Sequence, residues 1–166
     1  MTSSVEPERL SIRPATTADL ATLLDFRLAM MSDISRLEAN PAARPRGDGA
    51  DLREVNRLWI EEHFGHDFMA WIADLDGQPV ASAAVMWFEH PPGPANPAGR
   101  EAYILNVYTR PEARRMGLAR AVMERAVAEA RSAGAGRIWL RASDEGRPLY
   151  EAMGFETGKY LQLASR

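Results

Sequence analysis

Four arginines crowd into residues 110–120, a segment that leads into a predicted helix. One glutamate, Glu112, accompanies them, so the segment has a net charge of +3, whereas the whole chain has a net charge of −3. The first N–H groups of a helix have no intrahelical partner, and the helix dipole adds about half a positive charge there. Gly117 lets a bulky group approach this backbone, and Ala119 keeps the first turn slim. The pattern indicates a phosphate site, the alternative being a solvated helix cap with surface arginines.

Hydrophobic periodicity and turn residues place this segment among strands and helices. Apolar alternation and apolar runs predict strands over residues 10–13, 68–74, 79–88, 102–109 and 137–141, with a last strand or pair of strands over 155–163. Helical spacing predicts helices over 16–37, 51–65, 117–132 and 145–153. Proline and glycine predict loops over 38–50 and 90–100. The Asp76-Gly77 pair predicts an antiparallel hairpin between the second and third strands.

The order strand, helix, strand over residues 102–141 predicts a right-handed crossover between two parallel strands. In sheets of this kind, ligands bind at the carboxyl ends of strands and at helix amino termini. The fold class is therefore predicted as α/β (α+β), with the arginine-rich segment at a ligand-binding edge of the sheet.

The composition predicts one cytoplasmic domain. The chain has 166 residues, a length that suits a single core, and 46% of them are hydrophobic. The absence of cysteine excludes disulfides, thiolate metal sites and cysteine nucleophiles. No apolar run approaches the roughly 20 residues of a membrane helix, and Glu6, Glu8 and Arg9 occupy the region where a signal peptide would be apolar. The net charge argues against a nucleic-acid or acidic-membrane partner.

Three short strings carry a family resemblance. Arg114-x-x-Gly117-x-Ala119 follows Asn106-Val107-Tyr108-Thr109-x-Pro111 and precedes Tyr150-Glu151-x-x-Gly154-Phe155. In this order and spacing they resemble the GNAT superfamily of acyl-CoA-dependent N-acetyltransferases, and the preceding hairpin and paired helices fit that family too. The resemblance implies a single N-acetyltransferase domain over residues 1–166, with a core of about 10–163. It also implies a GNAT-like fold, a mixed and mostly antiparallel sheet with a splayed parallel strand pair and helices on both faces.

The resemblance implies acetyl-CoA as the cosubstrate. The pyrophosphate would be bound by the loop backbone, and the arginine side chains would be secondary. The residues of this loop are Arg114, Arg115, Met116, Gly117, Leu118, Ala119 and Arg120. Main-chain groups of Leu105, Asn106 and Val107 would pair with the pantetheine arm, which requires the parallel strands to splay after about residue 107, helped by a bulge in the first strand. Ser143 would bond the pantetheine or its sulfur, although family members often carry asparagine in this loop.

Two residues are the candidates for proton transfer. The resemblance makes Tyr150 the general acid for the departing thiolate, the alternative being a core aromatic. Glu101 is the candidate base, because it shares a strand face with Tyr103 and Leu105. Family members often hold their glutamate nearer to position 103, so Glu101 as a solvated strand-end charge and a bound water as the base remain open.

The predicted function is acetyl transfer from acetyl-CoA to a primary amine by direct attack, and the alternative is a catalytically idle acyl-CoA sensor. The missing cysteine agrees with direct attack. In the family, acceptor specificity lies in the loops that map to 38–50 and 90–100. In the first of these loops, Arg44 and Arg46 would attract an anionic group of the acceptor, whereas Glu38 and Asp48 would attract an amine, so the charges do not identify the acceptor. The expected partner is a small-molecule or peptide amine, with a homodimer left open. No metal is expected, and His63 with His66 is interpreted as a solvated helix end.

Overall fold

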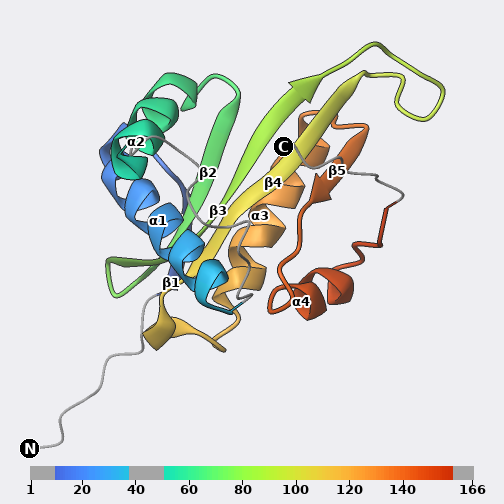
Figure 1. Ribbon diagram of the computed structural model, residues 1–166. Helices are drawn as coiled ribbons and strands as arrows, with labels where there is room; N and C mark the ends of the chain where they lie inside the picture. The colour runs from blue at the N-terminus through green and yellow to red at the C-terminus, as the bar shows by residue number, and fades with distance from the viewer. Residues whose placement is uncertain (1–9, 38–50, 159–166) are drawn as a thin grey trace, which may run out of the picture.

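Within the residues that the structure describes, strands from both halves of the chain form one mixed sheet of five strands (Figure 1). The computed structural model describes residues 10–37 and 51–158. The sheet has the order β1 (Leu10–Pro14), β2 (Phe68–Leu75), β3 (Gln78–Glu89), β4 (Arg100–Thr109) and β5 (Arg137–Leu140). The neighbours pair antiparallel up to β4, and β4 pairs with β5 in parallel. The predicted mixed, mostly antiparallel sheet is confirmed.

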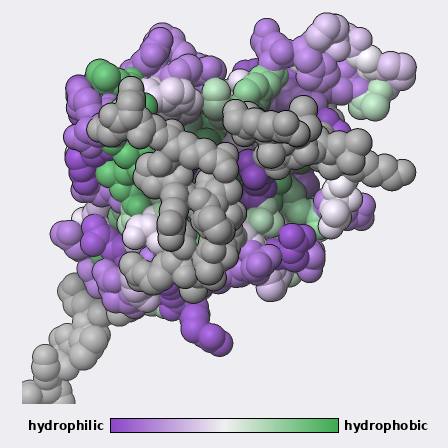
Figure 2. Space-filling model, in the orientation of Figure 1, coloured by the Kyte–Doolittle hydropathy of each residue, from purple (hydrophilic) through white to green (hydrophobic). Residues whose placement is uncertain are grey.

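Helices cover both faces of this sheet, as predicted (Figure 1). The helical elements are η1 (Thr17–Asp19), α1 (Leu20–Leu37), α2 (Leu52–His63), η3 (Pro111–Ala113), α3 (Leu118–Ser132) and α4 (Arg147–Ala152). Leu24 of α1 and Ile60 of α2 pack with Phe68 in one buried cluster, whereas Val122 of α3 packs with Ile104 in another. Hydrophobic colour also reaches the surface beside α2 (Figure 2), where Leu52, Val55 and Leu58 are exposed.

Several predicted boundaries differ from the structure. The first helix begins with a 3₁₀ turn, η1, before α1, and the second ends at His63 rather than near residue 65. Residues 155–158 form no strand, because the N–H of Phe155 bonds back to the carbonyl of Tyr150 (3.0 Å) and closes the turn after α4. The rest of the predicted last strand, and the predicted loop over 38–50, lie outside the described residues.

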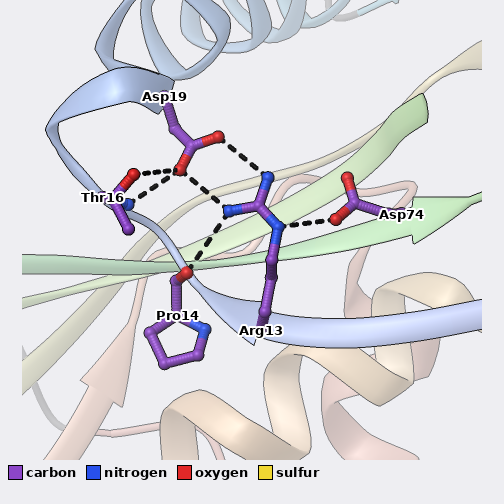
Figure 3. A network of polar contacts seen from close by, with 5 residues as sticks. All are labelled: Arg13, Pro14, Thr16, Asp19 and Asp74. Atoms are coloured by element: carbon purple, nitrogen blue, oxygen red, sulfur yellow. Dashed lines mark hydrogen bonds and ion pairs between the residues drawn. The ribbon is translucent and has the colours of Figure 1, made fainter. Parts of the chain in front are cut away.

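Arg13 on β1 ties the first helical turn to the sheet (Figure 3). Its two terminal nitrogens donate to both carboxylate oxygens of Asp19 (2.8 and 2.9 Å), and its Nε donates to Asp74 on β2 (2.6 Å). Asp19 also accepts hydrogen bonds from the backbone N–H and the hydroxyl of Thr16 (2.8 and 3.0 Å). Since the Arg13 guanidinium favours the carboxylate, the pKa of Asp19 lies well below its ordinary value.

Replacing Asp19 by asparagine tests this network. We expect Asp19→Asn to lower the free energy of unfolding by about 1–3 kcal/mol at pH 7, because Arg13 loses a charged acceptor. A depressed pKa means that this stability is complete above the ordinary carboxyl pKa of about 4 and is lost as the pH falls below it. The difference from the wild type, measured by urea unfolding, should therefore be constant above about pH 5 and shrink progressively as the pH is lowered from about 4 to about 2.

Asp25→Asn is the matched control. Asp25 pairs with Arg53 at 2.8 Å, but both side chains are more than half exposed. An exposed ion pair contributes little, so this variant should lose less than about 0.5 kcal/mol at any of these pH values. Equal losses in the two variants would contradict a special role for the Arg13 network.

Candidate active site

The parallel strands β4 and β5 separate part-way along β4. They pair from Glu101 and Arg137 to Ile104 and Leu140, where β5 ends while β4 continues to Thr109. The splay therefore begins after Ile104, earlier than the predicted position near residue 107, because β5 is too short to follow its partner. A cavity of about 860 Å³ opens there between α1, β4, the start of α3, the end of β5 and α4.

A β-bulge lies on β4 where the strands have parted. Ser82 pairs with Tyr108 and Ala84 pairs with Leu105, so β4 contributes one residue more than β3 over this stretch. Asn106, between the two pairs, has a left-handed φ of 53°. The predicted bulge in this strand is thus present, and it turns the backbone of the cavity wall out of the regular ladder.

An arginine from α1 holds this bulge. The Nη1 of Arg27 donates to the Oδ1 of Asn106 (2.6 Å), and its Nε donates to the Oδ1 of Asn56 on α2. The hydroxyl of Ser82 donates to the Asn106 carbonyl (3.3 Å). Burial lowers the pKa of Arg27. Arg27 was not among the residues predicted from the sequence, although an arginine between Leu24 and Leu28 in an otherwise apolar helical stripe is the signal that could have indicated it.

The arginine-rich segment wraps around the amino terminus of α3. Arg115 and Gly117 both adopt left-handed backbone conformations, with φ values of 65° and 79°, and Gly117 is the N-cap of α3. A Cβ added at Gly117 would meet no atom within 4 Å, so the backbone there borders open space. Alternating backbone conformations and free first-turn N–H groups together suit an anion.

Most of the predicted loop residues line the cavity. They are Arg114, Arg115, Gly117, Leu118, Ala119 and Arg120. Met116 does not line the cavity, and 47% of its surface is exposed. Of the predicted strand positions, Leu105, Asn106 and Val107 all line it.

The side chain of Arg114 fixes the loop to its surroundings. Its Nη2 donates to the Oδ2 of Asp33 on α1 (2.6 Å), and its Nε donates to the carbonyl of Thr109 (3.1 Å). Asp33 favours the charged guanidinium and raises the pKa of Arg114. This arginine therefore anchors the loop within the protein, which leaves the loop backbone to face a ligand.

Tyr150 and Ser143 meet on the opposite wall of the cavity, beside Gly146. A Cβ added at Gly146 would lie 3.1 Å from the Tyr150 hydroxyl and 3.2 Å from the Ser143 hydroxyl. The Ser143 hydroxyl also accepts a hydrogen bond from the N–H of Gly146 (3.2 Å). Burial, with a smaller contribution from Tyr103, raises the pKa of Tyr150. The phenol is therefore neutral, and able to donate a proton, at physiological pH.

Glu101 is not brought into this cavity in the described part of the chain. Its Oε1 accepts a hydrogen bond from Arg137 (3.1 Å) and contacts the Nε2 of His90 (3.2 Å), where β4 and β5 are still paired. Leu105, which lines the cavity, lies four positions further along β4, at a distance of roughly 13 Å. Glu101 is therefore absent from the described cavity lining that includes Tyr150, and its role as the base stays a prediction.

The histidines form no metal cluster. His63 contacts Asp67 through its Nδ1 (2.7 Å), an acidic partner that the sequence analysis did not identify. Over residues 10–37 and 51–158, no group of three or more metal-ligating side chains is found. The same described ranges contain no helix with the length and apolarity needed to cross a membrane.

Comparison with known proteins assigns the family. The model of the acetyltransferase (GNAT) family matches residues 32–155. The chain belongs to this family. The GNAT resemblance predicted from the sequence is thereby confirmed, and the protein is an acyltransferase. A comparison with curated proteins found no match.

Solved structures agree with the GNAT assignment. A protein from Clostridium acetobutylicum, described as a predicted acetyltransferase and solved with acetyl-CoA, has 29% identity and a TM-score of 0.80, covering 94% of this chain and 96% of its own. A GCN5-related N-acetyltransferase from Ralstonia eutropha has 27% identity and a TM-score of 0.79, with coverages of 95% and 99%. An aminoglycoside N-acetyltransferase in complex with CoA shares the fold at 15% identity and a TM-score of 0.71, with coverages of 99% and 99%.

Proposed function

We propose that this GNAT acyltransferase transfers an acetyl group from acetyl-CoA to the primary amine of a small-molecule or peptide acceptor by direct attack. The observation that carries the proposal is one cavity that is lined both by the amino terminus of α3, which suits an anion, and by a half-buried, neutral phenol. Gly117 and Tyr150 both line this cavity.

The fit of acetyl-CoA rests on the loop before α3 and on the splayed strands. The pyrophosphate would bind to the backbone from Arg114 to Arg120, where Gly117 leaves open space. The pantetheine arm would pair with the backbone from Leu105 to Val107, which β5 leaves unpaired beyond Ile104. Ser143 would bond the arm near its sulfur. The thioester supplies an activated acetyl group.

Proton transfer in the proposal uses Tyr150 and water. The amine nitrogen attacks the thioester carbonyl carbon, the carbon–sulfur bond breaks, and the departing sulfur takes the phenolic proton of Tyr150. The proton lost from the amine passes to water, and the phenolate is reprotonated by solvent. Glu101 has no step in this scheme, because it is paired with Arg137 outside the cavity.

Amine-dependent release of thiol from acetyl-CoA tests the function. With a panel of amino acids, amino sugars, polyamines and peptides, we expect at least one acceptor to release thiol faster than water does and to give an N-acetyl product by mass spectrometry. Acetyl-CoA binding without turnover across the panel would instead support the idle acyl-CoA sensor.

A further inference from the structure

Two arginines flank Tyr103 inside the cavity. Arg27 comes from α1 and Arg141 directly follows β5, and both line the cavity together with Tyr103. Burial raises the pKa of Tyr103, and the charges of Arg141 and Arg27 lower it. The two cations therefore act on one hydroxyl, although their elements are far apart in the sequence.

Neither arginine has a carboxylate partner in the described part of the chain. Both side-chain hydrogen bonds of Arg27 to the described residues go to neutral amide oxygens, those of Asn56 and Asn106, and three of its five N–H groups take no part in them. Arg141 is exposed and forms no ion pair with residues 10–37 or 51–158. Burial makes the charge of Arg27 costly without an anion, and the exposed Arg141 lines the same cavity with its charge unpaired by the described residues, so the two arginines favour an anion in a ligand.

Some other arginines of the chain have carboxylate partners. Arg13 binds two carboxylates, Arg57 binds Glu54 and Glu61, and Arg114 binds Asp33. Arg27 and Arg141 differ from these three arginines, because no carboxylate among the described residues pairs with either of them.

Three carboxylates also line the cavity, and none of them forms an ion pair with Arg27 or Arg141 among the described residues. Asp33 is held by Arg114, and Asp144 and Glu145 are exposed on the loop after β5. The charges that lower the pKa of Tyr103 are those of Arg141 and Arg27. The cavity is thus cationic beside the bulge that Arg27 holds.

We propose that the acceptor carries an oxyanion, a carboxylate or a phosphate, beside its amine, and that Arg27 and Arg141 bind it. Both groups match the planar fork of an arginine, which donates two parallel hydrogen bonds to such oxygens. This inference rests on the proposed function and deepens it, because it replaces an amine of any kind with an anionic amine. A polyamine would bring a second positive charge to the same place.

Matched acceptors measure the preference. Glycine and β-alanine are compared with their carboxamides, and phosphoethanolamine is compared with ethanolamine, by kcat/KM for acetyl transfer. We expect the oxyanion-bearing member of at least one pair to be favoured by at least about tenfold, since charged hydrogen bonds are worth that much. The favoured pair distinguishes carboxylate from phosphate. Equal or better transfer to the neutral members overturns the inference and leaves the proposed function standing.

Direct binding separates the two proposals if no transfer is seen. Calorimetry of the same pairs with the CoA-saturated protein gives the preference without turnover. Stronger binding of the oxyanion-bearing member supports the inference even when the proposed function fails. Equal or absent binding of both members overturns it.

Arg141→Gln is the variant that isolates recognition, because Arg27 also supports the bulge. We expect it to raise the KM of the oxyanion-bearing acceptor at least about tenfold, to leave the neutral acceptor unchanged, and to be partly rescued by Arg141→Lys. Arg125→Gln, on the exposed outer face of α3, is the control and should change neither value. A raised KM for acetyl-CoA with unaltered acceptor preference would assign Arg141 to the coenzyme and overturn the inference.

Discussion

Gly117→Glu should weaken acetyl-CoA binding at least about 100-fold. Gly117 is the N-cap of α3, and its backbone borders open space within the cavity. A carboxylate about 4 Å from a phosphate charge is repelled by roughly 4 kcal/mol at the effective dielectric constant of a protein surface. Solvent screening reduces this figure, and a loss of 100-fold corresponds to a little under 3 kcal/mol. Calorimetry or fluorescence titration with acetyl-CoA measures the change.

Gly117→Gln separates charge from backbone strain. Any side chain at this position must adopt a φ of 79°, which costs roughly 1–2 kcal/mol for a residue other than glycine. Glutamine has the size and the strain of glutamate without its charge, so we expect a loss of only several-fold. The gap between the two variants should narrow as the salt concentration rises. Equal affinities for wild type and Gly117→Glu would contradict the placement of the pyrophosphate at this loop.

The position and backbone shape of the loop before α3 could be predicted from the sequence because the signal is local. Gly117 is the left-handed N-cap of α3, and the arginines of the segment lie close to it in the sequence. The parallel pairing of β4 with β5 could be predicted equally well, since β4, α3 and β5 follow one another in the sequence. Local backbone physics therefore accounts for the conformation of this loop and for the sheet edge beside it, and the anion site stays a prediction.

Features that depend on distant contacts were missed. Arg27 reaches Asn106 from a position 79 residues away, and no periodicity in α1 indicates that partner. Glu101 pairs with Arg137 where β4 and β5 are still joined, and the early end of β5 places the parting of the two strands after Ile104. These outcomes are set by strand length and by cross-strand partners, which a residue pattern does not specify.

Tyr150→Phe should lower kcat at least about tenfold and leave the KM for acetyl-CoA nearly unchanged. Phenylalanine keeps the ring that packs edge-on against Phe155, with centroids 6.2 Å apart, and removes only the hydroxyl. Without a proton donor the sulfur must leave as a free thiolate, and general acid catalysis typically contributes about 100-fold or more. The effect should appear in turnover because the proton moves as the carbon–sulfur bond breaks.

The pH dependence and a second tyrosine make this test specific. Burial raises the pKa of Tyr150, so the phenol stays protonated below its ordinary pKa of about 10, and the ratio of wild-type to variant kcat should be constant from about pH 6 to pH 9. Tyr108 also lines the cavity, where its ring packs on Phe26 at 5.3 Å, away from Gly146. Tyr108→Phe should therefore change kcat less than about twofold. If Tyr150→Phe kept full turnover, or if both variants lost the same factor, Tyr150 would have no part in proton transfer, and a water would have to protonate the sulfur.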